Sequence, residues 1–119
     1  MIRHGSPPFL ECSGRGDRRF SAFYARPRSI NGLSIEEFYQ MSKVFEDGSR
    51  ASHWREAKGR RAVNAEECAR IYERLWREWV EQEDLTGVLV QATGLSDIFG
   101  QPGHVCQATV LWKIRSEAL

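Results

Sequence analysis

The sequence predicts one small α+β domain, dominated by helices and with a small N-terminal β-sheet. Three observations lead to this prediction. The 119 residues suit one domain with one hydrophobic core. Two stretches, 34–45 and 64–82, carry helix start signals. Aromatic residues near the N-terminus are typical of extended chain. Residues 1–8 are expected to be a loose start and residues 9–119 the single domain.

The N-terminal third supplies the expected sheet. The segment FLEC at 9–12 is assigned to a short strand. Residues 20–30, FSAFYARPRSI, are assigned to extended chain, in which Pro27 excludes a central position in a sheet. The dipeptide Asn31-Gly32 predicts a tight turn after it.

The first expected helix covers 34–45, SIEEFYQMSKVF, where Ser34 and Glu37 have the spacing of a capping box. Its apolar side chains point nearly all round the axis, which is typical of a buried helix. Glu36, Gln40 and Lys43 nevertheless follow the spacing i, i+4, i+7 and share one narrow face, which we call the polar stripe.

The polar stripe has three interpretations. Its charges face water, or they pair in a structural network, or they line a pocket, because an unpartnered buried charge is costly. Glu36 also lies near a helix N-terminus, where a carboxylate is favourable for structural reasons alone.

Two further helices are expected in the middle of the chain. One covers 51–58 and stops at Gly59, and the other covers 64–82, where Asn64 and Glu67 again have capping-box spacing. The apolar residues of the second follow one helix face, which predicts that its tryptophans belong to the core. These residues are Cys68, Ile71, Tyr72, Leu75, Trp76, Trp79 and Val80.

Periodicity leaves the C-terminal part less defined. Residues 85–93, LTGVLVQAT, suit a buried strand or a short helix equally. Residues 94–104 are expected to be a loop, and 107–119 are assigned to helix rather than strand.

Composition excludes several classes of protein. The net charge of +1 gives no global basic field for nucleic acid. The three cysteines form no CxxC pair, which favours a reducing compartment, and His104 with Cys106 lacks the paired spacing of known zinc sites. The N-terminus has no apolar run long enough for a signal peptide or membrane span. We therefore expect a cytoplasmic protein with no metal, no cofactor and no membrane partner.

The segment FSAFYARPRSINGLSIEEFYQMSKVF resembles the opening motif of the NADAR family, also called YbiA-like. Members of that family read approximately F-S-N-F, a short piece with a Gly, then S-E-H-Y-x-Q-x-x-K-F. Glu36, Gln40 and Lys43 fall on the family's Glu, Gln and Lys, and Tyr39 falls on its variable aromatic position.

Four later segments resemble family motifs in the same order. They are AKGRR, LTGVLVQAT, DIFG and VLWKIR, so the resemblance runs from about Phe9 to Arg115. Ala22, Glu37 and Phe99 depart from the family's Asn, His and Trp.

The resemblance implies an N-glycosidase or ADP-ribosyl hydrolase that cleaves the bond between a ribose and a base. The implied substrates are ADP-ribosylated guanine in nucleic acid and a phosphoribosyl pyrimidine intermediate of riboflavin synthesis. It also implies a helix-dominated α+β fold with a small sheet, and a bacterial or phage source is compatible with it. A non-catalytic domain that binds ADP-ribose or a nucleotide is the alternative, and a protein that keeps only the fold is a third possibility.

The polar stripe suits this chemistry, because cleaving a glycosidic bond builds positive charge on the sugar. Glu36 is the candidate carboxylate for stabilising that charge or accepting a proton, with Asp97 as a second acid. Lys43 is expected either to hold a phosphate or to form a Schiff base with the opened sugar. Gln40 would orient a hydroxyl or the lysine.

The substrate's other groups need their own contacts. Arg60 is expected to meet phosphate. Phe20, Phe23 and Tyr39 offer rings on which a base can stack, with core packing as the alternative for each.

Overall fold

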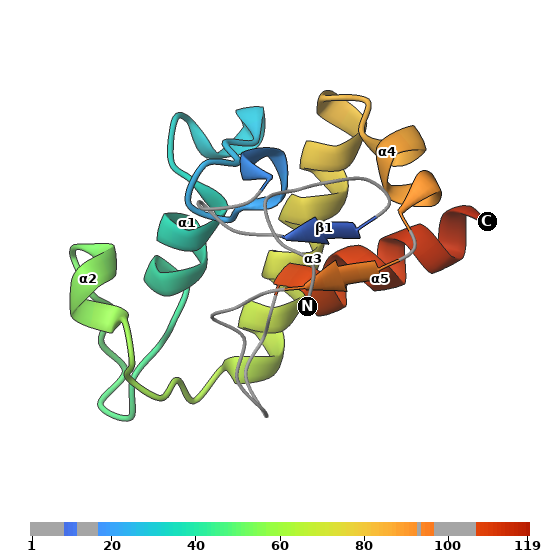
Figure 1. Ribbon diagram of the computed structural model, residues 1–119. Helices are drawn as coiled ribbons and strands as arrows, with labels where there is room; N and C mark the ends of the chain where they lie inside the picture. Colours follow the sequence, from blue (N-terminus) through green and yellow to red (C-terminus); the bar gives the residue numbers. More distant parts are fainter. Residues whose placement is uncertain (1–8, 12–16, 93, 97–106) are drawn as a thin grey trace.

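The computed structural model describes residues 9–11, 17–92, 94–96 and 107–119. Helix is the dominant structure of these residues (Figure 1). The α-helices are α1 Ile35–Met41, α2 Trp54–Ala57, α3 Ala65–Gln82, α4 Thr86–Gln91 and α5 Gln107–Ala118.

The long helix α3 is the centre of the arrangement. It runs through the middle of Figure 1, with α1 and α2 on its left and α4 and α5 on its right. Both α1 and α5 pack against α3, while α2 packs on α1 and α4 on α5. Leu75 and Trp76 of α3 are completely buried in the core. The helix expected over 64–82 is therefore confirmed.

The expected α+β fold with an N-terminal β-sheet is wrong. Helices dominate the described residues, where the strand pairing joins only two three-residue strands, β1 Phe9–Glu11 and β2 Gly94–Ser96, in parallel. β2 comes from a segment expected to be a loop, far from the N-terminal third. The pair is too small to form a layer of the fold, so the fold class is helical.

Residues 20–30, expected to be extended chain, are instead a series of turns, which we call the turn segment. The 3-10 turns Arg18–Phe20 and Arg28–Ile30 lie at its two ends. Between them the backbone amide of Ala25 donates to the carbonyl of Ser21 at 2.9 Å. These short-range hydrogen bonds occupy the backbone groups that a sheet would need. The aromatic residues in this segment therefore do not indicate a strand.

Several local predictions are confirmed. Asn31 and Gly32 form the turn with φ values of 53° and 90°. The capping box of Ser34 and Glu37 opens α1, although this helix ends at Met41, before the expected boundary. The ambiguous segment 85–93 contains the helix α4, and the closing segment is the helix α5.

The second predicted capping box is wrong. The side chain of Asn64 makes no cap hydrogen bond to α3. Its Nδ2 donates to the carbonyl of Ser42 at 2.9 Å, and its Oδ1 accepts from the amide of Val44 at 2.8 Å. Asn64 therefore joins the start of α3 to the segment that follows α1.

None of the helices in the described part of the chain has the length and apolar composition needed to cross a membrane.

Candidate functional site

The polar stripe begins on α1 with a pair of hydrogen-bonded side chains. Gln40 Nε2 donates to Glu36 Oε2 at 2.8 Å, one helical turn apart. Gln40 is buried, whereas Glu36 is only partly buried. The amide thus fixes a carboxylate that keeps access to solvent.

Lys43 lies two residues beyond the end of α1, yet its side chain stays close to the stripe. Its Nζ is 5.8 Å from the ring centroid of Tyr39. The side chain is only 8% exposed. Nζ donates to the carbonyls of Ala57 and Arg60 at 3.2 and 3.0 Å. The amine therefore holds the C-terminal end of α2 against α1.

The surroundings of the stripe change the protonation of two groups. Burial lowers the pKa of Lys43, and the attraction of Glu36 and Cys68 opposes that lowering without cancelling it. Burial raises the pKa of Tyr39, and the same two neighbours raise it further. The lysine amine is therefore neutral over a wider pH range than an exposed lysine would be.

One polar atom of the stripe is buried without a partner. Gln40 Oε1 has no hydrogen-bond partner among the described residues. The Gln40 amide cannot be flipped to give this oxygen a partner, because Nε2 donates to Glu36. After a flip, Oε1 would face the Glu36 carboxylate, and both groups are acceptors. A buried acceptor of this kind is costly unless a donor meets it.

The segment before α1 positions the candidate acid. The amides of Ile35 and Glu36 donate to the carbonyls of Ala25 and Ala22, each at 3.0 Å. The amide of Ala22 donates in turn to the side-chain oxygen of Gln107 at 2.6 Å. The start of α1 is thus tied to the turn segment, and the turn segment to the start of α5.

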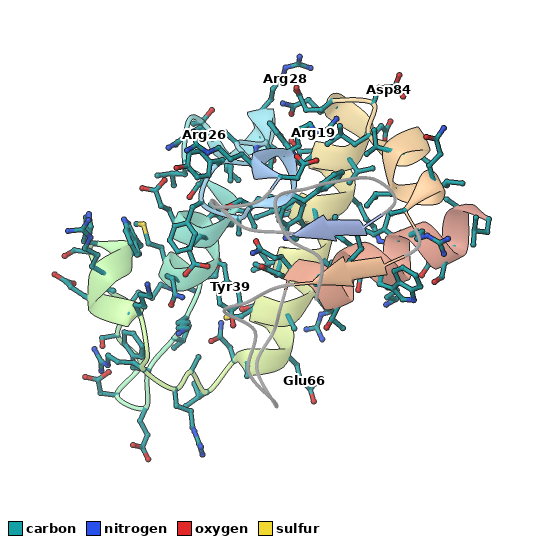
Figure 2. All side chains as sticks on the ribbon, viewed as in Figure 1. Arg19, Arg26, Arg28, Tyr39, Glu66 and Asp84 are labelled. Atoms are coloured by element: carbon teal, nitrogen blue, oxygen red, sulfur yellow. The ribbon has the colours of Figure 1, made fainter. Side chains whose placement is uncertain are left out.

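The expected stacking residues have different environments. Phe20 is completely buried in the core, which leaves no free face for a base. Tyr39 lies between α1 and α3, with its ring 5.0 Å from that of Tyr72 in an edge-to-face arrangement (Figure 2). Phe23 is 44% exposed.

The two remaining candidates are a cation and an acid. The guanidinium of the exposed Arg60 lies 3.6 Å from the ring centroid of Phe45. Asp97 lies outside the described residues. The structure thus brings Glu36, Tyr39, Gln40 and Lys43 together. The amine of Lys43 also contacts the backbone carbonyl of Arg60.

Sequence reasoning missed the residues beside Phe23. The ring of Trp54 lies 6.2 Å from that of Phe23, and the ammonium of Lys58 lies 5.4 Å from it. A signal was present, because residues 50–61 contain five Lys or Arg and one acid.

A surface depression of about 390 Å³ lies away from the polar stripe. It is formed by the end of α3 together with α4 and α5, and Asp84 marks it near the top of Figure 2. Its lining residues are Arg77, Val80, Glu81, Asp84, Thr86 and Ile114. None of the candidate residues contributes to it.

A comparison of the chain with protein-family models, curated proteins and solved structures finds no match in any of the three.

Proposed function

We propose that this chain is an N-glycosidase of the NADAR type that cleaves a ribose-to-base bond. The observation that carries the proposal is the accessible carboxylate of Glu36, fixed by Gln40 and placed near the buried amine of Lys43. The proposed ligand is ADP-ribose-like or phosphoribosyl in character. The absence of CxxC spacing suits a reducing compartment, so the proposed location is the cytoplasm.

The proposed reaction uses Glu36 at the sugar. The bond between ribose and base breaks, its electron pair leaves with the base, which takes up a proton, and positive charge develops on the ribose carbon until water bonds to it. The Glu36 carboxylate stabilises that charge or accepts a proton from the incoming water. Gln40 holds the carboxylate in one orientation, which reduces the reorganisation needed during the reaction.

The environment of Lys43 favours the Schiff base over the phosphate contact. Two N–H groups of the Lys43 amine already meet backbone carbonyls, which leaves few donors for a phosphate. Burial lowers its pKa, which increases the neutral form that attacks an aldehyde. In this proposal the exposed Arg60 meets the phosphate instead.

The same carbonyl contacts favour a second candidate function. An amine that joins α1 to the end of α2 has a sufficient structural reason to be buried. A non-catalytic domain that binds ADP-ribose or a nucleotide would keep this arrangement without using Lys43 in a reaction.

Steady-state kinetics test the proposal on an ADP-ribosylated guanine oligonucleotide and on a phosphoribosyl pyrimidine. Glu36→Gln keeps the size of the side chain and removes its charge, so turnover should fall by roughly 10²- to 10⁴-fold. Glu37→Gln is the matched control, because Glu37 serves the capping box and should affect helix stability more than turnover. Melting curves on both variants exclude unfolding as the cause.

Lys43 is tested by trapping. If it forms a Schiff base, borohydride should link wild-type protein covalently to the sugar, and Lys43→Ala should not be trapped. Nucleotide binding by calorimetry without turnover of either substrate would favour the binding domain. Wild-type turnover by Glu36→Gln would refute the proposed role of this carboxylate.

A further inference from the structure

Two aromatic side chains meet where the turn segment contacts α2. Phe23 comes from the turn segment and Trp54 is the first residue of α2. Their ring centroids are 6.2 Å apart and their planes cross at 70°. Phe23 is 44% exposed and Trp54 is partly exposed. We call this pair of rings the aromatic face.

Cations surround the aromatic face. The ammonium of Lys58 lies 5.4 Å from the centroid of Phe23 and 5.8 Å from that of Trp54. The guanidinium of Arg55 lies 5.2 Å from the centroid of Trp54. Both cations are exposed, and within the described ranges neither forms an ion pair with a carboxylate. Their charge therefore remains available to an anion.

The cations belong to a local concentration of positive charge. Residues 50–61 contain five Lys or Arg and one acid, in a chain whose net charge is only +1. The acid, Glu56, accepts from the amide and hydroxyl of Ser52. Two other acids lie near this segment. Glu37 accepts from the amide of Ser34 and pairs with Arg26, and Asp47 accepts from the amide and hydroxyl of Ser49. All three carboxylates thus have partners of their own, although their charges still reduce the positive field.

We infer that the aromatic face and its cations bind single-stranded nucleic acid. Unpaired bases stack on exposed aromatic rings, while Lys and Arg beside the rings meet the phosphates. A duplex hides its bases in the stack, and an acidic peptide would use the charges without needing the rings. The four-residue α2 is too short to present the continuous apolar face with which an amphipathic helix enters a membrane surface. The combination of rings and cations therefore fits a single strand best.

The position of the aromatic face relates it to the polar stripe. Ala22, which precedes Phe23, accepts a hydrogen bond from the amide of Glu36. Lys43 binds the carbonyls of Ala57 and Arg60 on either side of Lys58. A strand on this face would consequently lie beside α1. Binding itself requires no reaction, so the inference goes beyond the proposed activity.

Fluorescence anisotropy with labelled oligothymidylate of roughly 15 nucleotides tests the inference, with oligouridylate as a second probe that compares DNA with RNA. Trp54→Leu should weaken binding by about 5- to 150-fold, the range of one stacked base. Lys58→Gln should weaken binding and make the slope of log K against log salt shallower by about 0.7.

The chain offers matched controls on α5. Trp112 is 39% exposed and has the guanidinium of Arg115 4.5 Å from its ring centroid. Trp112→Leu therefore removes the same kind of side chain as Trp54→Leu, also next to a cation, but on α5. Lys113 is exposed and pairs with Glu73, so Lys113→Gln repeats the charge change. Both should bind the strand within about twofold of wild type. Circular dichroism confirms that all four variants are folded.

Several results would overturn the inference. The inference is wrong if wild type binds neither oligonucleotide, or if the α2 and α5 variants weaken binding equally. Equal affinity for duplex, for anionic vesicles or for a glutamate-rich peptide would show a purely electrostatic surface. The test is separable from the proposed reaction, because it measures binding of an unmodified strand, whereas the reaction is measured by turnover. Strand binding without turnover would contradict only the proposed enzyme, and turnover without strand binding would contradict only this inference.

Discussion

At the scale of single residues, Lys43 connects the fold to the candidate site. The sequence places it at the third position of the polar stripe, and its amine does lie near Tyr39. The sequence does not reveal that the chain leaves the helix before this residue, nor that the amine binds the carbonyls of Ala57 and Arg60. Those contacts depend on where α2 packs, which no local pattern specifies.

Asn64 gives a prediction at the same scale. Asn64→Asp keeps an acceptor for the amide of Val44 but loses the donor to the carbonyl of Ser42. It also sets a carboxylate beside that of Glu67, which the Asn64 amide meets at 2.8 Å. We expect the free energy of unfolding to fall by about 1–3 kcal/mol. Urea unfolding measures the change.

The double variant separates the two causes. In Glu67→Gln the charge repulsion is absent, so Asn64→Asp in that background should cost less than in wild type. A residual loss would then report the hydrogen bond to Ser42. If Asn64→Asp proves as stable as wild type, the side chain does not join α3 to the segment after α1.

At the scale of elements, strongly periodic or capped segments could be predicted and the others could not. The capping box of Ser34 and Glu37 is local, so the start of α1 was visible in the sequence. The end of α1 was not, because Val44 leaves the helix to bond to Asn64, 20 positions away in the sequence. The turn segment 20–30 was misassigned because aromatic content alone does not distinguish a strand from a loop that fills the core.

The core face of α3 was predicted correctly at Leu75 and Trp76 and less well at Ile71 and Trp79. Leu75 and Trp76 are fully buried, whereas Ile71 and Trp79 are only partly buried. Trp79 reaches the edge of the core, where its indole N–H donates to the carbonyl of Arg19 at 2.8 Å. Periodicity identifies the face of a helix but not how far the covering segments extend over it.

Leu75→Ala tests the contribution of this face. The substitution leaves a cavity in the completely buried centre of the core, so we expect a loss of roughly 2–5 kcal/mol in the free energy of unfolding. Val63→Ala is the control, because Val63 is 65% exposed and should change stability by no more than about 0.5 kcal/mol. Equal melting midpoints for the two variants would contradict the placement of Leu75.

At the scale of the whole molecule, total charge concealed an uneven distribution. A net charge of +1 argued against a basic field, and that statement holds only for the average over the chain. The local excess at 50–61 was countable in the sequence. Its placement beside Phe23 was not, because the two segments meet only through packing of α2 on α1. Part of the candidate site also depends on Asp97, which the structure does not describe.

Ion pairs between α3 and α5 give the molecule a dependence on acid. Glu73 accepts from Lys113 and from Arg77, and these hydrogen bonds hold the pKa of Glu73 below its ordinary value of 4.5. A carboxyl whose pKa is lowered by folding stabilises the protein above its unfolded value, and this stabilisation is lost as pH falls through the folded value. The contribution is therefore complete at neutral pH, begins to weaken near the ordinary value of 4.5 and is lost as pH falls through the lower pKa of the folded state.

Thermal melting between neutral pH and pH 3 measures this contribution. Glu73→Gln should be less stable than wild type at pH 7 by about 0.2–1 kcal/mol, the usual range for exposed pairs. The difference should shrink in acid as the wild-type carboxyl takes up its proton. Glu66→Gln, an exposed change on the same helix (Figure 2), is the control and should follow wild type. A difference that stays constant with pH would exclude the ion pairs as its cause.

The hydrogen bonds that tie Ala22 to Glu36 and to Gln107 have a consequence for amide hydrogen exchange. Amides in the first turn of a helix normally exchange quickly with solvent deuterium, because they have no partner within the helix. Those of Ile35 and Glu36 have carbonyl partners in the turn segment and should exchange slowly. Since Gln107 of α5 holds the other side of Ala22, Gln107→Ala should speed exchange at Glu36, although α5 is remote from it in sequence. Unchanged protection there would show that α1 and α5 open as separate cooperative units.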